Sequence, residues 1–168
     1  MSQWLPKMRP QRCMRGGVLP FTPTNLGTVS LYNNSTGAEV LVIWYVNTNS
    51  SDTVLQAGII QGKQGTAQTT VAPLITGNPI FAGQVCKLDT TTVMPFDQCF
   101  QYGQNPSASI NADLPWAILQ PGWSFVVQDT GDADEMCCSF VWQAAHVADI
   151  YESHCTVCDA IIEMKLTP

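Results

Sequence analysis

The sequence predicts an all-β protein, folded as one antiparallel β-sandwich or jelly roll with an extended N-terminal arm. Stretches rich in Val, Ile, Trp and Tyr, which β-sheets favour, recur along the chain. Turn residues separate these stretches, and none of them has the spacing of an amphipathic helix. At 168 residues, the chain is long enough to bury a hydrophobic core within one domain.

The first part of the chain, residues 1–24, is predicted to be a basic arm, and residues 25–168 the sandwich domain. Prolines and glycines in the arm disfavour a helix and remove hydrogen-bond donors from a sheet. Residues 1–38 carry a net charge of +4, whereas 3 basic and 13 acidic residues give residues 39–168 a charge of −10. We therefore expect the arm to contact a partner and the sandwich to fold without residues 1–17. The predicted contact residues are Trp4, Lys7, Arg9, Arg12 and Arg15.

The first strands of the body are expected at residues 27–34 and 38–48, paired as a hairpin around the turn residues 33–37. Residues 40–46 are apolar at both odd and even positions. This strand should therefore be covered on one face by a second sheet and on the other by a loop or a neighbouring subunit. Residues 54–83 contain short strand candidates, 54–60 and 66–74, broken by turns.

Further strands are predicted in the second half of the chain, at residues 84–90, 115–119, 123–130, 136–147 and 160–166. The turns Gln120-Pro121-Gly122 and Thr130-Gly131-Asp132 lie between them, because Pro presets the φ of a turn and Gly accepts a positive φ. Eight or so short strands punctuated in this way are typical of a sandwich or jelly roll.

The composition favours a protein that assembles. Charged residues make up 12% of the chain, about half of the ~25% typical of soluble domains, so copies of the protein repel each other weakly. We find neither a signal peptide nor a transmembrane segment, and expect synthesis in a cytoplasm. Seven cysteines, an odd number, are therefore expected to be mostly buried thiols. The glycosylation patterns at Asn33, Asn34 and Asn49 are interpreted as turn residues.

Two groups of residues form longer motifs. The first is Leu31-Tyr32-Asn33-Asn34-Ser35-Thr36-Gly37 followed by Val40-Leu41-Val42-Ile43; the second is the segment 117–128 followed by Cys138-Ser139-Phe140-Val141-Trp142-Gln143. Together they resemble motifs of tailed-bacteriophage virion proteins. In that group, such motifs open and close a β-sandwich. The present chain departs from the pattern after Trp142, where Gln143-Ala144-Ala145 replaces an acidic residue, and in its Cys-rich continuation to Pro168.

The resemblance implies a virion structural protein, assembled in the host cytoplasm. We expect no enzymatic activity, because the sequence contains no Gly-x-Ser-x-Gly elbow, phosphate loop or His-Glu-x-x-His motif. We expect a capsid decoration or cement protein that self-associates, with a trimer favoured, and bridges the major capsid protein or another virion protein. The alternative is a fibre or receptor-binding module that contacts a glycan. No cofactor, metal or membrane partner is expected. Nucleic acid is not expected as a partner either, because the acidic body should repel it.

The remaining candidate sites have plainer interpretations. A zinc-binding or redox site at Cys155 and Cys158, beside His154, remains a second alternative, although a further ligand pair is needed. The acidic residues Asp129, Asp132, Asp134 and Glu135 lack the spacing of an EF-hand and are interpreted as a solvated turn. Four of the five tryptophans fall in predicted strands, which favours core packing over a sugar-binding platform.

Overall fold

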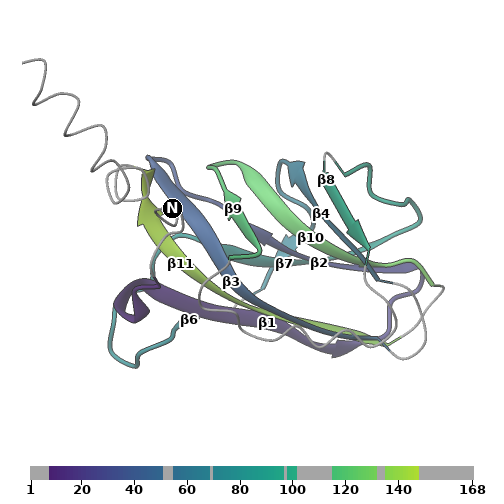
Figure 1. Cartoon of the computed structure of the whole chain (residues 1–168). Coiled ribbons are helices and arrows are strands. Elements are labelled where there is room, and N and C mark those ends of the chain that lie inside the picture. Colours follow the sequence, from purple (N-terminus) through teal and green to yellow (C-terminus); the bar gives the residue numbers. More distant parts are fainter. Residues whose placement is uncertain are drawn as a thin grey trace, which may run out of the picture.

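The computed structural model describes residues 8–50, 55–68, 70–96, 98–101, 115–131 and 135–147, and its architecture confirms the predicted β-sandwich. Every strand pairing is antiparallel. Figure 1 shows β1, β11 and β3 side by side in one layer and β2, β10 and β4 in the other. Sheet A has the order β6 (Ala72–Pro73), β1 (Cys13–Phe21), β11 (Met136–His146), β3 (Glu39–Ser50), β9 (Ala117–Leu119). Sheet B has the order β5 (Thr66–Ala67), β7 (Gln84–Thr90), β2 (Leu26–Tyr32), β10 (Trp123–Asp129), β4 (Leu55–Gln61), β8 (Gln98–Gln101).

The hydrophobic core lies between the two sheets. Alternate residues of β11, namely Met136, Cys138, Phe140, Trp142 and Ala144, all belong to it, as the period of two along a strand requires. The Phe125 ring of sheet B meets the Phe140 ring of sheet A edge to face, with centroids 6.3 Å apart. The two sheets are therefore joined by one continuous apolar layer.

The predicted hairpin of residues 27–34 and 38–48 is wrong, although both of its strands exist. β2 belongs to sheet B and β3 to sheet A, so the connection between them crosses from one sheet to the other. Among the described strands, no two that are neighbours in a sheet follow each other along the chain. Turn residues such as Asn and Gly show where the chain changes direction, but they do not show which sheet it enters.

The arm prediction needs a correction for residues 13–21. These residues form β1, paired with β11 and with β6, while Pro10–Arg12 forms a short 3₁₀ helix, η1. Glycine suits the close packing of β1: a Cβ on Gly17 would lie 2.7 Å from the main-chain carbonyl oxygen of Cys138, and one on Gly16 would lie 3.0 Å from Val85 and 3.2 Å from the Trp142 ring. Pro20 lies where the pairing with β11 becomes irregular, so its missing N–H breaks no regular ladder. Removing residues 1–17 would therefore delete half of a sheet strand and the buried Met14.

The expected burial of residues 40–46 on both faces is confirmed. On the inner face, Leu41, Ile43 and Val46 belong to the main core. On the outer face, Val40, Val42, Trp44 and Ala145 form a second buried cluster, against which Met8 and Val147 pack. A β-bulge places Trp44 between the pairs Ile43–Trp142 and Tyr45–Val141, which shifts the alternation by one residue.

The other strand predictions are largely confirmed in the described residues. β4, β7, β9, β10 and β11 lie within or close to the predicted ranges. The candidate at residues 66–74 divides into β5 and β6, which belong to different sheets. β8 was not predicted. The candidate at residues 160–166 lies outside the described residues.

Candidate functional site

The five predicted contact residues are not gathered on one surface of the described structure. Trp4 and Lys7 lie outside the described residues. The guanidinium of Arg12 forms an ion pair with Glu39 at 2.5 Å and lies 4.7 Å from the centre of the Phe81 ring. Arg12 therefore makes its contacts within the fold, joining η1 to β3 and to the loop that precedes β7.

Arg9 and Arg15 are both exposed but differ in their surroundings. The main-chain N–H of Arg9 donates a hydrogen bond of 2.6 Å to the side-chain oxygen of Gln143, which fixes the start of η1 against β11. Arg15 projects from the outer face of sheet A, since its neighbour Met14 points into the core. Arg15 also lines a pocket on this face.

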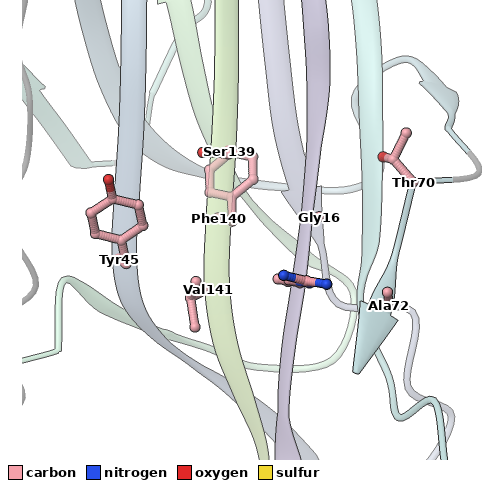
Figure 2. Close-up of a pocket in the computed structure, with 8 residues that line it drawn as sticks. Gly16, Tyr45, Thr70, Ala72, Ser139, Phe140 and Val141 are labelled. Carbon is pink, nitrogen blue, oxygen red and sulfur yellow. The ribbon is translucent and has the colours of Figure 1, made fainter. Parts of the chain in front are cut away.

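This pocket, hereafter the outer pocket, is the candidate functional site. It has a volume of about 440 Å³ and lies over β1, β11 and β3, beside the segment that leads into β6. Figure 2 shows Tyr45 on one side of β11 and Thr70 and Ala72 on the other. The lining residues are Arg15, Gly16, Tyr45, Thr70, Ala72, Ser139, Phe140 and Val141.

The strand register explains how residues far apart in sequence meet in the outer pocket. Arg15 pairs with Ala72 on one side and with Val141 on the other, and Val141 pairs with Tyr45. These four side chains form one row across four strands on the outer face of sheet A. Ser139, two positions before Val141, faces the same side of the sheet.

The outer pocket combines a cation, hydroxyl groups and apolar surface. Among the described residues that line it, Arg15 is the one charged residue, and none carries a carboxylate, imidazole or thiol. Within the described residues, the Arg15 guanidinium and the hydroxyls of Tyr45 and Ser139 make no hydrogen bond. The Thr70 hydroxyl donates to the carbonyl oxygen of Gly17, which leaves its own oxygen able to accept.

A second surface feature is an exposed apolar loop between β6 and β7. Its exposed side chains are Leu74, Ile75 and Ile80, and Ile80 is 66% exposed. We call these three residues the apolar loop surface. The sequence predicts only short strands and turns in this region.

Hydrogen bonds at both ends hold the loop of the apolar loop surface in place. Leu74 N–H donates to the Cys13 carbonyl at 2.8 Å, and the Asn78 side-chain amide donates to the Gln11 carbonyl at 3.1 Å. At the far end, the Trp142 indole N–H donates to the Ala82 carbonyl at 2.9 Å. The apolar side chains are therefore presented by an ordered backbone.

The described cysteines Cys13, Cys86, Cys137 and Cys138 are free thiols. Burial raises the pKa of Cys13 to about 11 and raises the pKa of Cys138 well above its usual value. Among the described residues, no group of three His, Cys, Asp or Glu side chains could hold a metal ion. His154, Cys155 and Cys158 lie outside those residues.

The buried thiols lead to a labelling prediction. At pH 8, N-ethylmaleimide should modify the half-buried Cys137 at least ~10-fold faster than Cys13 or Cys138, because the reagent attacks accessible thiolate. Site-resolved mass spectrometry of the folded protein checks this result, with protein in urea as the control in which the rates converge. Equal labelling of Cys137 and Cys138 in the folded protein would contradict the assigned strand faces.

The raised pKa of Cys13 also makes the free energy of unfolding depend on pH. In the unfolded chain Cys13 ionises near pH 9.0, whereas in the folded protein its pKa is about 11. The contribution of Cys13 to the free energy of unfolding should therefore be fully present below pH 9.0 and fall as the pH rises towards 11.

The acidic turn after β10 is partly described. Asp129 is fully buried, and its carboxylate accepts hydrogen bonds from the Ser50 hydroxyl and, at 2.9 Å, from the Gly131 N–H. It therefore connects the end of β3 to the end of β10 and is not the solvated residue that we expected. Asp132 and Asp134 lie outside the described residues.

The tryptophans that are described belong mainly to the core, as predicted. Trp44 and Trp142 are fully buried, and Trp116 packs partly buried against the main core. Trp123 is half-buried at the start of β10. A sugar-binding platform made of Trp44 and Trp142 is therefore excluded in this fold.

Comparisons of the chain with protein-family models, with curated proteins and with solved structures find no match. In the part of the chain that is described, no helix has the length and apolar character needed to cross a bilayer.

Proposed function

We propose that this protein is a non-enzymatic virion structural protein, a capsid decoration or cement protein that self-associates and bridges capsid subunits. The observation that carries this proposal is the apolar loop surface, which places Leu74, Ile75 and Ile80 on an ordered loop in contact with solvent. The low charge of the chain and its resemblance to tailed-bacteriophage virion proteins give further support. The partners would be copies of this chain, with a trimer favoured, and the major capsid protein or another virion protein.

An ordered apolar loop suits an assembly contact for two reasons. Its backbone is already fixed by the bonds of Leu74 and Asn78, so little conformational entropy is lost on association. Burying its side chains would contribute roughly 25 cal/mol for each Å² of apolar surface. Repetition of such a contact over a particle converts a modest single affinity into avidity.

The sheet edges favour association through side chains rather than strand addition. Among the described strands, those at the edges of the two sheets are only two to four residues long. Short edges offer few unpaired backbone groups to another chain. Self-association would therefore use a surface such as the apolar loop surface.

The test is the mass of the protein in solution after the double substitution Ile75→Ser and Ile80→Ser. Light scattering should show a small closed oligomer for the wild type and a monomer for the double variant. Association would bury these two isoleucine side chains, so their loss should weaken association at least ~100-fold. Both side chains are exposed in the protomer, so thermal unfolding of the diluted monomer should change little.

The matched control is Leu19→Ser. Leu19 is 79% exposed and lies in β1, six residues beyond the Cys13 that bonds to the loop, about 20 Å along the strand. This variant should remain oligomeric. A wild-type protein that is monomeric at high concentration, or a double variant that keeps the wild-type mass, would refute the proposal.

A further inference from the structure

We infer that the outer pocket binds a carboxylated sugar residue, a hexuronic acid or a sugar acid of similar chemistry. This inference concerns the outer face of sheet A and is independent of the apolar loop surface and of the proposed assembly. Its basis is the row Ala72, Arg15, Val141 and Tyr45, which places a cation and an aromatic ring on either side of a small apolar residue.

The shape of the outer pocket suits a single ring. Tyr45 and Arg15 lie two strands apart, which separates their backbones by about 10 Å. Figure 2 shows Tyr45 beside Val141. Val141 is short and pairs with Arg15 on one side and with Tyr45 on the other, so the longer side chains of Arg15 and Tyr45 extend beyond it. The volume of about 440 Å³ falls within the range of roughly 300–1,000 Å³ typical of small-molecule sites.

The charge of the ligand follows from Arg15. Its guanidinium has no hydrogen-bond partner or ion pair in the described structure, and no acidic residue lines the pocket. A guanidinium binds a carboxylate through two parallel N–H···O bonds, which fix the orientation of the anion as well as its position. The protein as a whole carries a net charge of −6, so attraction of an anion must come from this local group.

The body of the ligand follows from the other lining residues. Tyr45 and Val141 offer apolar surface, which suits the C–H face of a sugar ring. Ser139 and Thr70 offer hydroxyls that a simple aliphatic acid would leave unmatched, and Thr70 can act only as an acceptor while it donates to Gly17. A ring that carries both hydroxyls and a carboxylate pairs with all of these groups.

The experiment is a ligand-observed NMR titration of the full chain with four probes. Methyl glucuronide should bind with a Kd on the order of 1 mM, as expected for a ligand of this size. Glucose, acetate and glucose 6-phosphate should each bind at least ~10-fold more weakly, because each lacks the carboxylate or the sugar ring. Equal binding of glucose 6-phosphate would indicate a general oxyanion site and equal binding of acetate a simple anion site, and each would overturn the inference, as would no binding of the glucuronide at 10 mM.

Variants of the two facing residues assign the binding to the outer pocket. Arg15→Gln should weaken glucuronide binding at least ~10-fold, because a charged hydrogen bond is lost. Tyr45→Ser should weaken it through loss of the ring, whereas Tyr45→Phe should retain most of the affinity. The control Lys63→Gln removes the same charge from an exposed position outside the pocket and should bind as the wild type does. Unchanged binding by Arg15→Gln, with thermal unfolding like that of the wild type, would overturn the inference.

Discussion

Replacing Gly83 with alanine is expected to lower the free energy of unfolding by about 3 kcal/mol. Gly83 has a φ of +123°, a conformation that L side chains rarely adopt, and that strain costs about 1–2 kcal/mol. A Cβ at this position would also lie 2.6 Å from the Trp142 Cε2, and overpacking of this kind costs about 1–3 kcal/mol. Urea unfolding followed by tryptophan fluorescence measures the change.

The indole cannot move away at low cost. Trp142 is fully buried between the sheets, and its N–H donates to the Ala82 carbonyl, the residue immediately before Gly83. A shift of the ring would break this bond and disturb its contacts in the core. The clash therefore has to be absorbed by the loop, which is also fixed by the hydrogen bond from Gly83 N–H to the Asn34 side-chain oxygen at 2.8 Å.

Two other glycines separate the two contributions. Gly77 has a φ of +91° with nothing within 4 Å of an added Cβ, so Gly77→Ala should cost about 1 kcal/mol from backbone strain alone. Gly37 has open space as well and lies outside the positive-φ range, so Gly37→Ala should be neutral or slightly stabilising. If Gly83→Ala lowered the free energy of unfolding no more than Gly77→Ala does, the contact between the added Cβ and the indole would contribute nothing to the loss.

The sequence predicted the strands better than their connections. Composition and alternation are local properties, and they located β7 and β10 at or within one residue of their observed bounds. Pairing between strands is not local: in the described structure each strand pairs with partners distant along the chain. The hairpin proposed for β2 and β3 followed from the turn residues between them, which are compatible with either a hairpin or a crossing between sheets.

β1 was missed because local preference and tertiary packing disagree there. Its glycines and proline predict an irregular segment, but Gly16 fits against Val85 and Trp142 from two other strands. The candidate site was found only in part for the same reason. Arg15 was singled out by charge, whereas Tyr45 and Ser139 carried no signal until the strand register brought them beside it.

Asn33 shows how much of the crossing between sheets depends on one side chain. The residue is fully buried directly after β2, and its side-chain N–H groups donate to the carbonyl oxygens of Glu39, at 3.0 Å, and Leu119, at 2.9 Å. Its side-chain oxygen accepts from the Ser35 N–H at 3.0 Å. The amide nitrogen is thus occupied in the folded protein, which agrees with its interpretation as a turn residue rather than a glycosylation site.

Replacing Asn33 with alanine is expected to lower the free energy of unfolding by about 3 kcal/mol, because two carbonyls and one N–H lose their partners, and a buried unpaired group costs about 1–3 kcal/mol. Urea unfolding measures this loss. The control is Asn34→Ala: Asn34 is exposed and loses one bond, to Gly83 N–H, so about 1 kcal/mol is expected. Similar losses of free energy for the two variants would mean that water replaces the partners of the Asn33 side chain. The crossing from sheet B to sheet A would then be held by the main-chain hydrogen bonds of Asn33 to Trp123 and Gly122 instead.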